Sequence, residues 1–295
     1  MPSTRFFSIT GMLVLLLGSA GCGPARLGGT GPYVDPMTGV ETDPGICDAG
    51  DCGCRVCPDM RQNGAAPLGV LLGIPAYFYK TTIWDRAIAA APTVGLLVVN
   101  PSDGPGRALD PHFTDVIGRG QAAGIRVIGY VNTQYGDRSS TDVIAEVNRY
   151  YDFYKPSGIF FDEGPGSSTC AAQYSKYQSF AAAARARDPK AFLAINPGAG
   201  TCESYLGLFD VIVTAESNIS DYAKYKQPDW TRKYNRNRFW HLVYGISSNE
   251  MQSTLQKAAG NGAGWVYVTS ENQPNPWNAL PTWFGDEITA AKIAP

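Results

Sequence analysis

The sequence predicts an α/β protein built as a (β/α)8 TIM barrel, and two observations support this fold class. Eight short apolar segments recur along residues 67–295, and most are continuous rather than alternating, which is typical of parallel strands buried on both faces. Helix-like stretches fill the intervals, and the region is close in size to the usual barrel of about 250 residues. An open doubly wound sheet is the alternative, because periodicity alone does not show closure.

Residues 1–22 have the features of a lipoprotein-type signal peptide. Arg5 supplies a basic start, residues 6–17 are apolar but short for a membrane span, and small residues lead up to Cys22. This end resembles the lipobox of bacterial lipoproteins, which would make Cys22 the lipidated first residue of the mature chain, although Ser19 stands where Leu is usual. We expect an exported protein, attached to the cell envelope through its lipid or, alternatively, secreted with cleavage nearby.

Residues 23–66 form a predicted tether rich in Gly, Pro and Cys. The stretch has almost no large apolar residues and so cannot bury enough surface to fold by itself. Because an exported chain meets an oxidising compartment, its closely spaced cysteines favour two small disulfides over a zinc site, although their pairing is open. These cysteines are Cys47, Cys52, Cys54 and Cys57.

The eight predicted strands are rich in Val, Ile, Tyr and Phe, which favour strands. They occupy residues 70–79, 94–100, 126–133, 158–163, 191–196, 209–216, 239–245 and 264–270.

Several of the intervals carry helix-start signals, such as capping residues and a proline at the first helical position. They are Thr81 or Thr82 before residues 83–91, Asp110 with Pro111, residues 139–141 before 143–154, and a capping box of Ser247 and Glu250 before 251–259.

Composition and motifs exclude several classes of function. The chain has 24 basic and 26 acidic residues without a basic stripe, so a nucleic-acid partner is not expected. Nucleotide-binding glycine motifs and the G-x-S-x-G elbow are missing from the sequence. His112 and His241 are its two histidines, which does not favour a histidine-based metal centre. We expect no metal and no cofactor, which leaves carboxylates as the catalytic groups.

Polar and aromatic residues cluster in or just beyond the predicted strands. Aromatic faces at the mouth of a barrel suit the C–H faces of sugars, and side-chain amides can both donate to and accept from hydroxyl or acetamido groups. The residues expected to bind substrate are Asn100, Tyr130, Asn132, Tyr135, Asn196, Trp240 and Tyr244. Trp277, in the loop after the last strand, is a further aromatic residue at this end.

Cysteine counting predicts a disulfide at the rim of the barrel. Removing Cys22 to lipid leaves six of the seven cysteines, and four of these lie in the tether. Cys170 and Cys202 follow the fourth and fifth strands, so they lie in neighbouring loops at the same end of the barrel. We expect them to be paired, with two free thiols as the alternative.

Three motifs at strand ends resemble the spherulin-4 family, which includes glycoside hydrolase family 135. They are residues 100–106 (NPSDGPG), 129–136 (GYVNTQYG) and 158–163 (GIFFDE), and the resemblance extends from residue 69 to the C-terminus. It implies a (β/α)8 barrel with endo-α-1,4-N-acetylgalactosaminidase activity on galactosamine-containing exopolysaccharide, such as that of biofilms. The family's acidic residues carry over to Asp162, Glu163 and, less directly, Glu216.

The chemistry of glycoside hydrolysis agrees with these residues. It needs two carboxyl groups on either side of the scissile bond, and neighbours in a strand point to opposite faces, so Asp162 and Glu163 cannot face each other across a sugar. We assign Asp162 as the nucleophile of a retaining mechanism, Glu216 as the acid/base, and Glu163 as a supporting or substrate-binding acid. Glu271, after the eighth strand, is the rival of Glu216.

Two other classes of function remain open. One is a non-catalytic carbohydrate-binding barrel at the cell surface, which would use the same aromatic residues without an acid pair. The other is a structural envelope or spore protein. The sequence leaves the physiological polymer and its acetylation undetermined, and we expect a monomer.

Overall fold

The computed structural model describes residues 33–34, 41–42, 69–198 and 200–294. The chain divides into two compact units, residues 1–51 and 52–295. In the first unit, β1 (Tyr33–Val34) pairs antiparallel with β2 (Glu41–Thr42), within the stretch expected to be a tether. The expectations for Cys22 and for the four tether cysteines fall outside the described residues.

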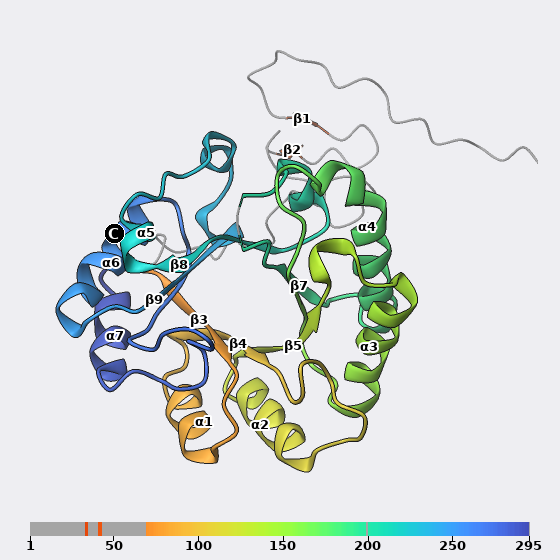
Figure 1. Ribbon diagram of the computed structural model, residues 1–295, viewed down its shortest axis with the longest axis horizontal. Helices are drawn as coiled ribbons and strands as arrows, with labels where there is room; N and C mark the ends of the chain where they lie inside the picture. The colour runs from red at the N-terminus through yellow and green to blue at the C-terminus, as the bar shows by residue number, and fades with distance from the viewer. Residues whose placement is uncertain (1–32, 35–40, 43–68, 199, 295) are drawn as a thin grey trace, which may run out of the picture. The chain divides into compact units, whose positions relative to one another are not determined.

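The second unit contains a closed barrel of eight parallel strands. The order is β10-β3-β4-β5-β6-β7-β8-β9, with β10 pairing back to β3, so the predicted (β/α)8 barrel is confirmed and the open sheet is excluded (Figure 1). The strands are β3 (Leu71–Ala76), β4 (Val94–Val99), β5 (Arg126–Asn132), β6 (Gly158–Asp162), β7 (Phe192–Ile195), β8 (Val211–Asn218), β9 (Phe239–Tyr244) and β10 (Trp265–Val268).

Helices surround the barrel, but two of the expected strand–helix units are incomplete. Full helices are α1 (Thr81–Ile88), α2 (Pro111–Ala122), α3 (Ser140–Phe153), α4 (Cys170–Arg187), α6 (Ser248–Gly260) and α7 (Phe284–Ala291). After β7 the chain forms only the 3-10 turn η2 (Glu203–Gly207), and after β8 the four-residue α5 (Ile219–Tyr222) followed by 3-10 turns η3 (Asp229–Lys233) and η4 (Arg236–Arg238). The outer layer beside β7 and β8 therefore lacks a full helix.

The helix-start signals have mixed outcomes. Asp110 caps α2 by accepting a hydrogen bond from the His112 N–H, and Ser247 with Glu250 forms the expected capping box of α6. The expected threonine cap of α1 is wrong, because α1 already begins at Thr81 and Lys80 occupies the cap position without a side-chain bond. In the described part of the chain, no helix combines the length and the apolar character needed to cross a membrane.

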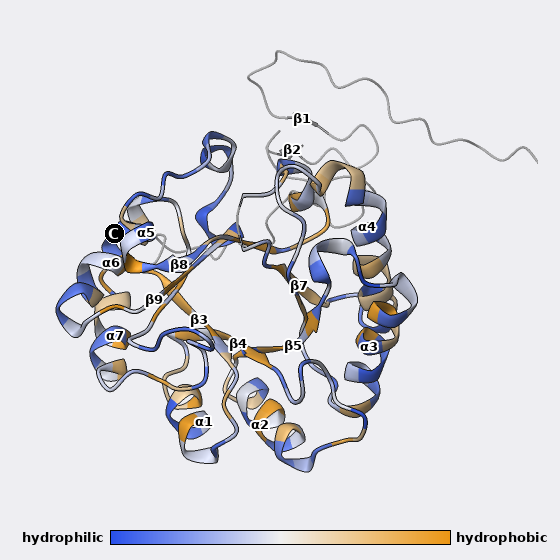
Figure 2. Ribbon diagram, in the orientation of Figure 1, coloured by the Kyte–Doolittle hydropathy of each residue, from blue (hydrophilic) through white to orange (hydrophobic). Residues whose placement is uncertain are grey.

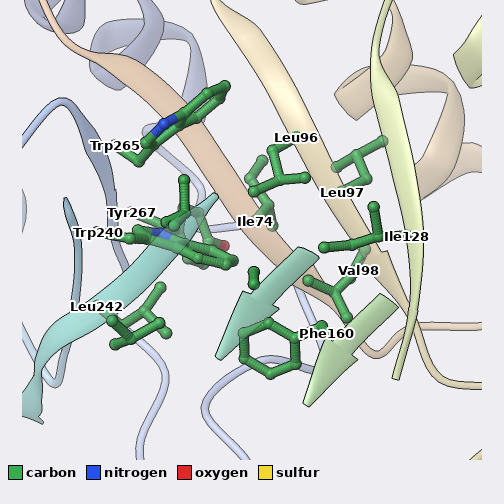
Figure 3. Packing of buried hydrophobic residues seen from close by; sticks show 14 of the residues in the cluster. Ile74, Leu96, Leu97, Val98, Ile128, Phe160, Trp240, Leu242, Trp265 and Tyr267 are labelled. Carbon is green, nitrogen blue, oxygen red and sulfur yellow. The ribbon is translucent and has the colours of Figure 1, made fainter. Parts of the chain in front are cut away.

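Hydrophobic colour lies on the barrel strands and on the helix faces turned toward them, and the outer helix faces are hydrophilic (Figure 2). Inside the barrel, Trp240 of β9 packs edge-on against Phe160 of β6, with ring centroids 5.6 Å apart (Figure 3). Gly73 of β3 makes room for this indole, since a Cβ there would lie 3.0 Å from it. Because Trp240 contacts β6 and β3 on other sides of the barrel, its side chain lies in the barrel interior, where it has no exposed surface.

Candidate active site

The site is built where β6, β7 and β8 end side by side. Asp162 is the last residue of β6, Glu216 lies near the end of β8, and Asn196 directly follows β7, the strand between them. The Asn196 Nδ2 group donates to Asp162 Oδ1 at 2.8 Å and to Glu216 Oε2 at 2.5 Å. The two carboxylates, called the acid pair below, are therefore closer together than the sum of these distances.

Asn196 itself is firmly held. It is 5% exposed, its Oδ1 accepts from the Gly198 N–H at 3.0 Å, and its backbone N–H donates to the Phe161 carbonyl at 2.9 Å. Both hydrogens of an amide nitrogen can be donated, and here each has a carboxylate partner. Asn196 was expected to bind substrate, but in the structure its amide positions the acid pair.

The environment of the acid pair disfavours charge. Burial raises the pKa of Asp162 to about 7, with a further contribution from the charge of Glu216, against the hydrogen bonds from the Glu163 N–H, Asn196 and Tyr130. Burial also raises the pKa of Glu216, against hydrogen bonds from Asn196 and Trp277. Unlike the pKa of Asp162, that of Glu216 is raised by burial alone, without a contribution from a neighbouring charge. Two adjacent carboxyl groups of this kind titrate as one unit and share a proton.

Glu163 directly follows Asp162 and has a left-handed backbone with φ of 50°. Its carbonyl accepts from the Tyr135 N–H at 2.6 Å and from Thr133 Oγ1 at 2.8 Å. Gln134 and Tyr135 are left-handed too, with φ of 47° and 54°. Such conformations cost roughly 1 kcal/mol or more for residues other than glycine and often gather at functional sites.

Two tyrosines lie close to the acids. Tyr135 is 57% exposed, and burial, followed by the charges of Glu163, Asp162 and Glu216, raises its pKa. Tyr130 is buried and hydrogen-bonded to Asp162, and its ring meets Tyr77 edge-on at 5.4 Å. The structure thus brings two of the three predicted tyrosines, Tyr130 and Tyr135, to the acids and adds Tyr77, which had no assigned role.

Trp277, which also had no assigned role, contacts Glu216 from the loop after β10. Its indole N–H donates to Glu216, which lowers the pKa of that carboxyl, and its carbonyl accepts from the Tyr77 N–H at 3.1 Å. Its ring packs edge-on against Tyr244 at 6.1 Å. The sequence shows a tryptophan in the loop after the last strand. It does not show that this tryptophan contacts Glu216 on β8.

Other predicted residues have different positions. Asn100 Oδ1 accepts from the Gly104 N–H at 2.8 Å, and Asn132 Oδ1 accepts from the Gln134 N–H at 2.7 Å, so both amides shape their own loops. Trp240 is enclosed in the barrel interior, so the expected substrate contact for this residue is wrong. The side chain of Glu271 accepts from Ser270 Oγ at 3.5 Å.

The remaining expectations concern cysteines, histidine and metal. Cys170 and Cys202 form the predicted disulfide, with Cα atoms 5.8 Å apart. His241 is buried outside the acid pair, between Tyr222 OH at 2.7 Å and Thr214 Oγ1 at 3.1 Å, and burial lowers its pKa to about 3. In the region that the structure describes, no cluster of His, Cys, Asp and Glu side chains is suited to hold a metal ion.

Fold and site together define a (β/α)8 barrel with partly buried carboxylates at the carboxyl ends of its strands. The chain belongs to spherulation-specific family 4, whose model matches residues 71–291, so the expected resemblance is confirmed. Spherulin-4 of Physarum polycephalum is 30% identical over 244 residues, which cover 78% of this chain and 72% of that protein. The crystal structure of Aspergillus clavatus Sph3 in complex with GalNAc superimposes with a TM-score of 0.67 at 20% identity, covering 76% of this chain and 98% of that one.

Proposed function

We propose that this protein is an endo-acting glycoside hydrolase that cleaves α-1,4-linked polysaccharide containing galactosamine or N-acetylgalactosamine. The observation that carries the proposal is the shared hydrogen bonding of Asp162 and Glu216 to one amide nitrogen of Asn196. Their separation falls well short of the about 6.5–9.5 Å typical of inverting enzymes and is compatible with the about 5–5.5 Å of retaining ones. The GalNAc bound to the related Sph3 supports an amino sugar as substrate.

In this mechanism Asp162 attacks the anomeric carbon while Glu216 gives its proton to the leaving glycosidic oxygen. Glu216 then removes a proton from water, which attacks the anomeric carbon and releases Asp162. The proton shared by the acid pair has to be on Glu216 when the substrate oxygen arrives. Asp162 is then ionised, and Asn196, Tyr130 and the Glu163 N–H supply the hydrogen bonds that stabilise its charge.

The test is cleavage of the polymer by purified variants, followed by mass spectrometry of the products. Asp162→Asn keeps the shape but removes the nucleophilic charge, so we expect turnover to fall by several orders of magnitude in a folded protein. Glu216→Gln should lose roughly 10²–10⁴-fold, and less with an activated leaving group that needs no proton.

Azide separates the roles of the carboxylates. In a retaining enzyme it replaces the activated water, so it should restore Glu216→Gln and give a glycosyl azide with retained configuration, but it should not restore Glu163→Gln. Glu271→Gln is the matched control and should stay active. Near wild-type cleavage by Asp162→Asn would overturn the assignment, and loss confined to Glu271→Gln would move the acid/base role to that residue. Binding without any cleavage by the wild type would favour the carbohydrate-binding barrel.

A further inference from the structure

Two side-chain hydroxyl groups meet at the backbone of the dipeptide that carries Asp162. Thr133, the residue after β5, has its Oγ1 atom 2.8 Å from the Asp162 carbonyl and 2.8 Å from the Glu163 carbonyl. The hydroxyl of Tyr177, on α4, lies 2.6 Å from the same Oγ1 atom. Neither Thr133 nor Tyr177 has any exposed surface. The mechanism proposed for the acid pair gives neither hydroxyl a part.

The direction of these hydrogen bonds follows from the chemistry of the partners. A carbonyl oxygen only accepts, so Thr133 turns its single proton toward the two carbonyls and shares it between them. Tyr177 therefore donates to Thr133 Oγ1, which keeps lone pairs that can accept. This donation polarises the threonine hydroxyl and strengthens its bonds to the carbonyls. One chain of hydrogen bonds thus runs from α4 to the backbone of Asp162 and Glu163.

This chain of hydrogen bonds fixes the peptide unit between Asp162 and Glu163. The unit is planar, so a fixed carbonyl oxygen also fixes the direction of the N–H. That N–H belongs to Glu163 and donates to the Asp162 carboxylate. Thr133 also holds the Glu163 carbonyl, so it contacts the peptide units on both sides of this left-handed residue. Such a strained conformation persists only where the surrounding contacts enforce it.

We propose that Thr133, oriented by Tyr177, is a positioning residue for the Asp162 carboxylate, because its hydroxyl keeps the Glu163 N–H directed at that carboxylate. Thr133 has no exposed surface, so it acts through the backbone and not on the substrate. Its effect on turnover rests on the proposed function, in which Asp162 is the nucleophile. Its effect on the ionisation of Asp162 does not depend on that function.

The experiment removes both hydroxyl groups with Thr133→Val/Tyr177→Phe, which leaves no buried hydroxyl without its partner. The Asp162 carboxylate then loses part of the hydrogen bond from the backbone, which stabilises its charged form, so its pKa should rise above about 7. The measurement is an NMR titration of isotope-labelled aspartate carboxyl groups without substrate, assigned with Asp162→Asn. The other groups that set this pKa stay in place in the variant, namely Glu216, Asn196 and Tyr130.

Turnover gives a second measurement on the same variant. We expect kcat to fall roughly 5–30-fold, as for a weakened hydrogen bond to a charged group, while KM changes less than about twofold. The acidic limb of the pH profile of kcat/KM should move to higher pH, because Asp162 has to be ionised to attack. Thr133→Ser keeps the hydroxyl and should retain most of the turnover and the wild-type profile.

Thr254→Val is the matched control, because it removes another buried threonine hydroxyl, which donates to the Glu250 carbonyl within α6. It should leave both the pKa of Asp162 and kcat unchanged. If the double variant does not fold, Tyr177→Phe alone removes only the outer donor and should give a smaller shift in the same direction.

An unchanged pKa of Asp162 in a folded variant without these hydroxyl groups would overturn the inference. Equal changes in Thr133→Ser or in Thr254→Val would overturn it too, because they would not depend on the Thr133 hydroxyl. A raised pKa of Asp162, together with no cleavage by the wild-type protein, would support the positioning role of Thr133 and overturn the hydrolase proposal instead.

Discussion

At the scale of single residues, the surroundings of the acid pair disfavour the charged form of both carboxyl groups. Asp162 and Glu216 are largely withdrawn from water and lie against each other, so the second charge of the pair is costly. Asn196 offsets part of this cost by donating to both groups. The result is a pair that keeps a proton at a pH where exposed carboxyl groups have lost theirs.

This arrangement predicts how Asp162→Asn affects stability. The pKa of Asp162 is about 7 when folded against a reference of 3.8, so the unfolded chain loses this proton first and stability falls as pH rises between these values. Asp162→Asn has no carboxyl group at this position, so its stability does not fall with pH for this reason. Its free energy of unfolding should match the wild type near pH 4 and exceed it near pH 8, by at most about 4 kcal/mol.

Urea unfolding at the two pH values measures this difference. Asp229→Asn is the control, because the Asp229 side chain is fully exposed and its removal should give no comparable gain at the higher pH. An Asp162→Asn protein that gains nothing over the wild type near pH 8 would contradict the burial argument.

At the scale of elements, the loops after β6 and β7 are tied together around the site. Cys170 at the start of α4 is bonded to Cys202 just before η2. Two hydrogen bonds join the same loops, from Tyr205 OH to the Cys170 carbonyl at 3.0 Å and from Thr201 Oγ1 to the Pro165 carbonyl at 2.9 Å. These links hold the two segments that carry Asp162 and Asn196.

The disulfide should contribute to stability mainly by restricting the unfolded chain. It closes a loop with a sequence separation of 32, for which we expect about 2–4 kcal/mol. Replacing both Cys170 and Cys202 with alanine should lower the unfolding midpoint. A reducing agent should bring the wild type down to the midpoint of the variant and leave the variant itself unchanged. A wild-type midpoint that does not respond to reductant would contradict this contribution.

The shortened elements after β7 and β8 also affect the site. Pro197 and Gly198 follow β7, and neither favours a helix interior, while α5 after β8 has only four residues. A full helix does not cover the flank of β8, and a cavity lined by Glu216, Ser217 and Tyr225 lies there. An incomplete strand–helix unit thus provides room beside Glu216.

At the scale of the whole molecule, closure of the barrel brings the carboxyl ends of all eight strands to one mouth, as in other barrels of this class. The sequence of residues 1–22 bears on where the protein is located. We infer from its basic, apolar and small residues that Cys22 is lipidated. Since one acyl chain gives only marginal membrane binding, stable attachment requires the several chains of a lipoprotein.

Replacement of this cysteine tests the inference. Cys22→Ser should move the protein from the membrane fraction to the soluble fraction of the producing cells, as followed by immunoblotting. The Cys170→Ala/Cys202→Ala variant keeps Cys22 and should remain with the membranes. Unchanged membrane association of Cys22→Ser would show that lipid at this position does not anchor the protein.

The sequence by itself determined the features that depend on local pattern. Continuous apolar runs marked all eight strands, and acids at two strand ends marked Asp162 and Glu216. Cys170 and Cys202 could be paired because the loops after consecutive strands meet at one end of a parallel barrel. Each of these inferences needs only the direction of a strand and the order of its neighbours.

Tertiary structure decided which side chains meet. Strand β9 is apolar on both faces, so its sequence does not show that Trp240 points into the barrel interior, below the mouth. Asn196 bridges the acids because β7 lies between β6 and β8, and Trp277 reaches Glu216 from a loop that follows β10. Such contacts join segments far apart in the chain, and the twist, register and closure of the whole barrel set their distances.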